Sequence, residues 1–310
     1  MNTFQRFSII TIAMTYILIF IGGLVRVSGA GMGCPDWPQC FGHWIPPTNI
    51  EQVPLEFRDQ FNLVLAWIEY SNRLFGALVG LVVTATMYLA FKHYNNIYRI
   101  KFSVCAAFLL TLFEGWLGSV LVDTVLNPIT ITLHLLFALV IIMLLIYSWI
   151  EAYYLNNPLS EKTSIYPNNL RTIFMLFSFL IMIEIILGTE IRGGLEMTRE
   201  DNPLVESQFL LKMLGPFKYM HTILGVLITG ISLYLWNIFV RKSINPSTII
   251  LLSSHGLLGL LILQIFLGEF LVLFNFTPLI QLFHLWFASL ILGLLVIQYS
   301  AWKQSQNSYV

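Results

Sequence analysis

Eight long apolar stretches, separated by shorter polar segments, run along the chain. A helix needs about 20 apolar residues to cross the hydrocarbon core of a bilayer, so each stretch predicts a membrane-spanning helix. The predicted spans cover residues 8–28, 67–91, 101–122, 129–150, 171–190, 217–239, 247–273 and 279–301. No stretch alternates as the strand of a membrane barrel does. The pattern therefore predicts an all-α membrane protein with eight transmembrane helices.

The composition agrees with this interpretation. The 310 residues are 57% hydrophobic and only 10% charged, whereas a typical soluble domain has about 25% charged residues. The formal net charge is zero, which leaves no basic surface for a nucleic acid. No Arg-rich, Ser-rich leader precedes the first span, and this favours the inner membrane of a bacterium over an organelle.

The distribution of Lys and Arg predicts that both termini are cytoplasmic. In that orientation nine of these residues lie inside and seven outside. Every predicted inner loop then carries Lys or Arg, and the two long outer loops are rich in Asp and Glu.

The spans repeat as two sets of four. Asn72 precedes His134 by 62 residues, His221 precedes His284 by 63, and a glycine stands 16 residues before each of the two later histidines. An even number of spans in each set gives the two copies parallel topology. The repeat predicts two pseudo-symmetric four-helix bundles, at residues 1–150 and 171–310, joined by a cytoplasmic linker at residues 151–170.

Three of the six histidines lie one or two turns from the predicted outer ends of their helices: His134, His221 and His284. A single histidine in an apolar helix is more often a packing residue, but three at repeat-related depths favour a common role. Imidazole is the usual axial ligand of haem iron, and helical bundles build cofactor sites from facing helices. We therefore expect His221 and His284 to form a bis-imidazole haem site.

The equivalent positions of the first half are Asn72 and His134. An asparagine carboxamide is a poor iron ligand, so this half has one strong ligand and an open or water-filled position. Alternatively, Asn72 caps its helix or bonds a neighbour.

Glu69 lies three residues before Asn72, on the same face of the predicted helix. Beside a haem it could accept a proton or stabilise a developing cation. Equally, it could pair with Arg73 at the membrane boundary or complement the helix dipole. The same question applies to Glu114, whose equivalent in the second half is the neutral Gln264.

The first predicted outer loop carries Cys34 and Cys40, separated by five residues that include two prolines. A disulfide between them suits an oxidising compartment, and an exposed bridge could be redox-active. At the outer ends of two spans, Arg26 and Arg192 either bind haem propionates through paired hydrogen bonds or extend toward the lipid interface.

Several motifs together resemble the haem A synthase family. They are Gly22–Arg26 (GGLVR), Ser28–Cys40 (SGAGMGCPDWPQC), Glu69–Arg73 (EYSNR) and the histidines 134, 221 and 284. The resemblance covers essentially the whole chain. It implies an oxidoreductase that oxidises the C8 methyl of haem O to a formyl group, giving haem A for terminal oxidases.

The resemblance also implies roles for individual residues. Glu69 matches the catalytic carboxylate of the family, and Cys34 and Cys40 match its loop cysteines. The substrate haem O would lie near His134, Arg73 and Arg26, with Asn72 where the family motif has histidine. Haem b would be the cofactor, with His221 and His284 as its axial ligands.

Implied partners are a haem O synthase that supplies the substrate, the terminal oxidase and membrane lipid; the sequence leaves a homo-oligomer open. An alternative function is a non-catalytic haem-binding electron carrier or oxidase assembly factor, which Asn72 favours. The repeats would also suit a transporter, but no span has the Gly/Pro break at mid-helix that builds a transport site.

Overall fold

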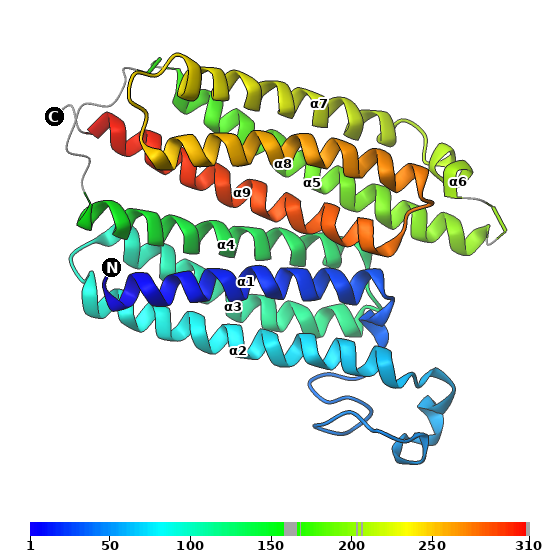
Figure 1. Cartoon of the computed structure of the whole chain (residues 1–310). Coiled ribbons are helices and arrows are strands. Elements are labelled where there is room, and N and C mark those ends of the chain that lie inside the picture. The colour runs from blue at the N-terminus through cyan, green and yellow to red at the C-terminus, as the bar shows by residue number, and fades with distance from the viewer. Residues whose placement is uncertain (158–165, 168, 203, 206, 308–310) are drawn as a thin grey trace. The chain divides into compact units, whose positions relative to one another are not determined.

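The structure is a computed structural model that describes residues 1–157, 166–167, 169–202, 204–205 and 207–307. Within these ranges the chain is helical and contains no β-strand (Figure 1). Among the described residues, eight helices are long and apolar enough to cross a membrane, which confirms the eight predicted spans. They are α1 (Thr3–Val27), α2 (Leu63–His93), α3 (Tyr98–Asp123), α4 (Pro128–Asn156), α5 (Leu170–Asp201), α7 (Phe217–Trp236), α8 (Thr248–Leu273) and α9 (Pro278–Asn307). The protein is therefore a multi-pass membrane protein.

The remaining elements are short. Three 3₁₀ turns, η1 (Ala30–Met32), η2 (Ile50–Gln52) and η3 (Leu55–Gln60), lie between α1 and α2. We call residues 28–62 the disulfide loop. In the second half, α6 (Ser207–Met213) precedes α7, and the π-helical turn η4 (Asn237–Arg241) continues α7.

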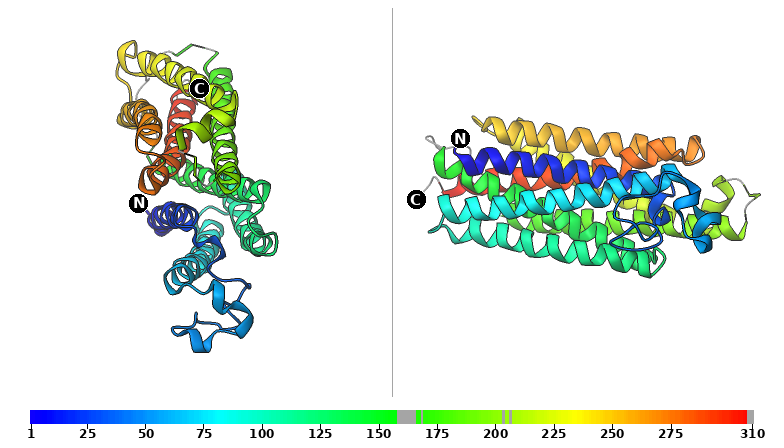
Figure 2. Two further views of the ribbon diagram at one scale, coloured as in Figure 1. Left: turned by 90° about the vertical axis from the view of Figure 1, so that its right-hand side faces the viewer. Right: turned by 90° about the horizontal axis from the view of Figure 1, so that it is seen from below.

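The chain divides into two compact units, Met1–Trp149 and Ile150–Val310. In the first unit α1 packs along α2 and α2 along α3, while the disulfide loop lies at the start of α2 (Figure 2). Its apolar core includes Val79 and Val83 of α2, Ala107 of α3, and Ile141 and Leu145 of α4.

In the second unit α8 packs along α9, α7 along α8, and α5 along both α7 and α9. Each unit thus has its own helical core. The pseudo-symmetry between the units and the cytoplasmic termini stay predictions.

Polar side chains form the N-caps of several helices. Asn62 accepts the backbone N–H groups of Val64 and Leu65, so α2 begins four residues earlier than its apolar stretch predicts. Such caps satisfy the donors that the first turn of a helix leaves unpaired.

The turns that join α3 to α4 and α8 to α9 share an uncommon conformation. Val125 and Leu126 have φ values of 50° and 59°, and Asn275 and Phe276 have 52° and 57°. Positive φ is rare for residues with a side chain. Two consecutive residues adopt it at repeat-equivalent positions, so the backbone supports the internal repeat.

The helix of the fifth span does not end at residue 190, where the apolar stretch ends. α5 continues to Asp201, and within this extension Arg192 and Glu196 form an ion pair one turn apart. Such a pair supports helix in a polar stretch. Arg192 therefore lies inside a helix and not beyond a helix end.

The predicted linker is shorter than expected. Residues 151–156 belong to the last turns of α4. Residues 158–165 and 168 of the predicted linker lie outside the described residues.

Candidate functional site

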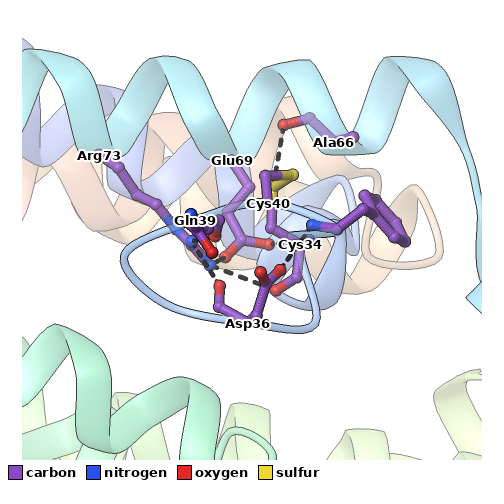
Figure 3. A network of polar contacts seen from close by, with 8 residues as sticks. Cys34, Asp36, Gln39, Cys40, Ala66, Glu69 and Arg73 are labelled. Carbon is purple, nitrogen blue, oxygen red and sulfur yellow. Dashed lines mark hydrogen bonds and ion pairs between the residues drawn. A yellow bond between two sulfur atoms is a disulfide. The ribbon is translucent and has the colours of Figure 1, made fainter. Parts of the chain in front are cut away.

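The disulfide loop is fastened to α2 by one arginine. A disulfide joins Cys34 to Cys40. The side chain of Arg73 extends into the segment that this disulfide closes (Figure 3). The guanidinium of Arg73 donates to the carbonyl oxygens of Asp36 (2.7 Å), Gln39 (2.8 Å) and Cys34 (3.2 Å). A delocalised cation with five N–H donors suits a cluster of carbonyl groups, so Arg73 acts as the internal anchor of the loop.

Glu69 lies one turn before Arg73 and is only 5% exposed. It forms an ion pair with Arg73 through one oxygen, and its other oxygen accepts the backbone N–H of Cys34 at 2.9 Å (Figure 3). The loop can come this close because residue 33 is glycine, where a Cβ would lie 2.5 Å from the backbone of Leu65. The ion-pair interpretation of Glu69 is thus present in the structure, and the catalytic role stays a prediction.

Asn72 points from α2 toward α1. Its Oδ1 is buried and has no hydrogen-bond partner among the described residues, and a Cβ on Gly22 would lie 3.9 Å from it. Asn72 is not a helix cap, because α2 begins at Leu63 with Asn62 as its cap; that interpretation is wrong. The carboxamide oxygen of Asn72 is therefore free to accept a hydrogen bond from a bound group or a water molecule.

In the same unit His134 of α4 is paired with Glu114 of α3. The Nδ1 atom of His134 lies 2.6 Å from Oε2 of Glu114, and the two side chains are 38% and 12% exposed. The oxygen lies off the axis of the ring N–H, so the contact is short but is not aligned as a hydrogen bond. The buried Nδ1 faces a carboxylate, which leaves Nε2 as the nitrogen for a ligand.

The second unit contains a similar pair on different helices. The Nδ1 atom of His221, on α7, lies 3.1 Å from Oε1 of Glu184, on α5, a close contact that, like that of His134, lacks hydrogen-bond alignment. A Cβ on Gly188 of α5 would lie 3.3 Å from the ring of His221, and one on Gly225 of α7 would lie 3.0 Å from Glu184. A glycine on each helix therefore makes room for the polar side chain of the other helix.

His284 of α9 faces His221. Their ring centroids are 6.3 Å apart with an interplanar angle of 69°, and Nδ1 of His284 is buried without a hydrogen-bond partner among the described residues. Two imidazoles on one metal, with metal–nitrogen bonds of about 2 Å, have ring centres about 6 Å apart. The separation of the two rings fits a bis-imidazole haem.

The arginines at the ends of α1 and α5 differ in their surroundings. Arg192 donates to Glu196 at 2.8 and 2.6 Å and to the side-chain oxygen of Gln281 in the first turn of α9. Arg26 lies in the last turn of α1. A role for Arg26 at a haem O site stays a prediction.

Sequence reasoning did not single out Glu184 or Gln281. A signal for Glu184 exists, because it is the only ionisable residue between Arg171 and Glu190, and a carboxylate at membrane depth is usually functional. For Gln281 no comparable signal exists, since a glutamine in the first turn of a helix is common.

An eight-span helical protein with two facing, partly buried histidines belongs to the class of membrane proteins whose ligand sets suit haem iron. Comparison with known families makes this specific. Residues 5–296 match the model of the family described as cytochrome oxidase assembly protein. The chain belongs to this family.

Three relatives extend over nearly the whole chain, and all three are named heme A synthase. The protein of Shewanella oneidensis is 28% identical, over 96% of this chain and 97% of its own length. That of Ehrlichia canis is 27% identical over 92% and 81%, and that of Rickettsia prowazekii is 23% identical over 98% and 99%. The similarity is moderate in identity and nearly complete in length.

Proposed function

We propose that this protein is a haem A synthase of the bacterial inner membrane, which oxidises the C8 methyl of haem O to a formyl group for terminal oxidase assembly. The full-length similarity to proteins named heme A synthase supports this function. The single observation that carries it is the facing pair of histidines on α7 and α9.

His221 and His284 would hold haem b in the second unit. Bound there, haem b supplies one-electron transfer. The two residues fix the orientation of the group by approaching from separate helices, and the apolar helices around them exclude water.

His134 would be the one strong ligand for the haem O iron in the first unit. Oxidation of a methyl to a formyl group adds one oxygen atom and passes four electrons to an acceptor; with water as the source of oxygen it also releases four protons, so the site needs a proton acceptor. We assign this role to Glu69 from its match to the family motif. Arg73 and the N–H of Cys34 hold its carboxylate in one orientation at the loop end of α2.

The disulfide loop would limit access of water to this end of the first unit. Three carbonyl groups of the loop converge on one arginine, and the disulfide closes the same segment. Asn72, one turn from Glu69, would orient water or the reacting group through its unpaired oxygen.

The test is conversion in cells. The protein is co-expressed with a haem O synthase in a host that makes no haem A, and the extracted pigments are separated by chromatography. We expect haem A with the unchanged protein and only haem O with His134→Ala. His255→Ala is the matched control, because the exposed ring of His255 contacts only its own helix and Trp236 among the described residues. Unconverted haem O with the unchanged protein, beside a converting relative, would exclude the synthase function.

A second candidate function is a haem-binding electron carrier or assembly factor without turnover. Asn72 favours it, because a poor ligand stands at the position of a family histidine. Glu69→Gln separates the two functions: a synthase keeps its haem b spectrum but loses conversion, while a carrier has no conversion to lose.

A further inference from the structure

Two carboxylates in the membrane-spanning helices touch histidines but have no part in the reaction proposed above. We propose that Glu184 and Glu114 are positioning residues: each holds Nδ1 of one histidine, so that Nε2 of His221 or His134 is turned toward haem iron. This inference rests on the proposed haem binding. It assigns a task to residues that the family motifs do not contain.

The pair of Glu184 and His221 is built by more than proximity. Glu184 is 18% exposed in an otherwise apolar stretch of α5, where an ionised group is costly without a partner. Gly225 lies one turn after His221, and any larger residue there would displace the carboxylate. Gly188 stands in the same relation to Glu184 and accommodates the imidazole. The two helices are thus shaped to bring this carboxylate to this ring nitrogen.

The pair of Glu114 and His134 uses a different helix. At the equivalent position of the second unit, Gln264 donates its amide to the backbone oxygen of His284 at 2.8 Å and leaves the ring alone. Conversely, the equivalent of Glu184 in the first unit is Leu18, and a Cβ on Gly76 would lie 3.9 Å from it. Each unit therefore has one histidine supported by a carboxylate, at a different position of the repeat.

The chemistry favours an orienting role over a purely structural one. Histidines that bind metals usually donate their second ring N–H to a carboxylate or carbonyl, which fixes the tautomer and makes the ring a stronger donor. A stronger donor stabilises the more highly charged, oxidised iron. Removing the carboxylate should therefore raise the reduction potential of the haem and weaken its binding about 10- to 100-fold. A salt link that only fastens two helices would change neither quantity.

The experiment compares three proteins purified with their haem: the unchanged chain, Glu184→Gln and Glu269→Gln. Glu269 is the matched control, because it is an exposed carboxylate on α8. Redox titration and electron paramagnetic resonance follow the bis-imidazole haem. We expect a more positive potential and altered low-spin g values in Glu184→Gln, with Glu269→Gln unchanged. Identical values in all three proteins would overturn the proposal while leaving haem binding intact.

Glu184→Asp keeps the result interpretable if Glu184→Gln loses its haem. A retained haem at the original potential in the aspartate variant supports the proposal, since the charge is conserved. Loss of haem in both variants, with both eluting as single species, overturns it in favour of packing. Absence of haem from the unchanged chain would instead refute the proposed function, so the two failures are distinguishable.

Glu114 is tested in a chain that lacks the second site. In the His221→Ala/His284→Ala background, hemin titration measures the first unit alone. Adding Glu114→Gln, which copies the second unit at this position, should weaken hemin binding about tenfold or more. Equal affinities with and without Glu114 would show that its contact with His134 only joins α3 to α4.

Discussion

The two units share the conformation of one turn but differ in the polar residues of their helices. Their short turns, at Val125–Leu126 and Asn275–Phe276, have the same left-handed conformation. Between α5 and α7 the second unit carries Glu184 and His221, while the equivalent residues of the first unit are Leu18 and Asn72. At this position of the repeat the histidine and its carboxylate are both present in the second unit and both absent from the first, whereas His284 has Gln264 in place of the carboxylate that contacts His134. An ionisable residue in an apolar helix is costly without a partner, which favours the presence of Glu184 and His221 as a pair.

The greatest expected effect is on the second unit. His221→Ala and His284→Ala each remove one of the two proposed haem ligands, so each should abolish the low-spin haem spectrum. Absorbance spectra of the purified variants check this, with His255→Ala as the control. A low-spin spectrum in both variants would show that the second unit does not bind haem through these two histidines, and the proposed difference in ligand number between the units would be wrong.

Arg73→Ala should destabilise only the first unit. It leaves Glu69 buried beside three unpaired carbonyl groups, and breaking a buried ion pair in this way costs about 3–5 kcal/mol. Thermal unfolding should begin at a lower temperature, while the haem b spectrum of the second unit remains. The control is Arg6→Ala, an exposed arginine of the same unit; equal melting of the two variants would contradict the anchoring role.

Asn72→His should make the first unit resemble the second. A second strong ligand would then stand opposite His134, and we expect hemin affinity of this unit to rise about tenfold. The titration uses the background without His221 and His284. The combined variant Leu18→Glu/Asn72→His adds the missing carboxylate and should bind more tightly still. An unchanged affinity in both would mean that residue 72 does not face the haem.

The smallest effect concerns two equivalent glycines. Gly76→Ala places a methyl 3.9 Å from Leu18, an ordinary contact, whereas Gly225→Ala places one 3.0 Å from Glu184. Alanine in place of glycine stabilises a helix interior by about 1 kcal/mol, so Gly76→Ala should raise the melting temperature slightly. Gly225→Ala should lose that gain and shift the haem b potential. Equal melting temperatures and an unchanged haem b potential in both variants would show that Gly225 does not confine the carboxylate of Glu184.

Much of this molecule is predictable from local sequence. The eight spans follow from apolar length, and the cysteine pair and the histidines follow from residue type and spacing. Glu184 was missed because its function depends on a contact between α5 and α7. The hydrogen bond from Cys34 to Glu69 was missed because backbone donors leave no trace in the sequence. The polar end of α5 was predicted to be a loop because it lacks an apolar pattern. The Arg192–Glu196 ion pair that supports helix there brings the two side chains together only if the segment is helical.

The extra length of α5 has a consequence for how the protein meets its surroundings. Its 32 residues form a rod about 48 Å long, whereas the hydrocarbon layer is about 30 Å thick. The charged residues after residue 190 are at one end of the rod, so we expect the last turns to extend beyond the hydrocarbon layer. Another protein could therefore bind the polar end of α5 without entering the bilayer.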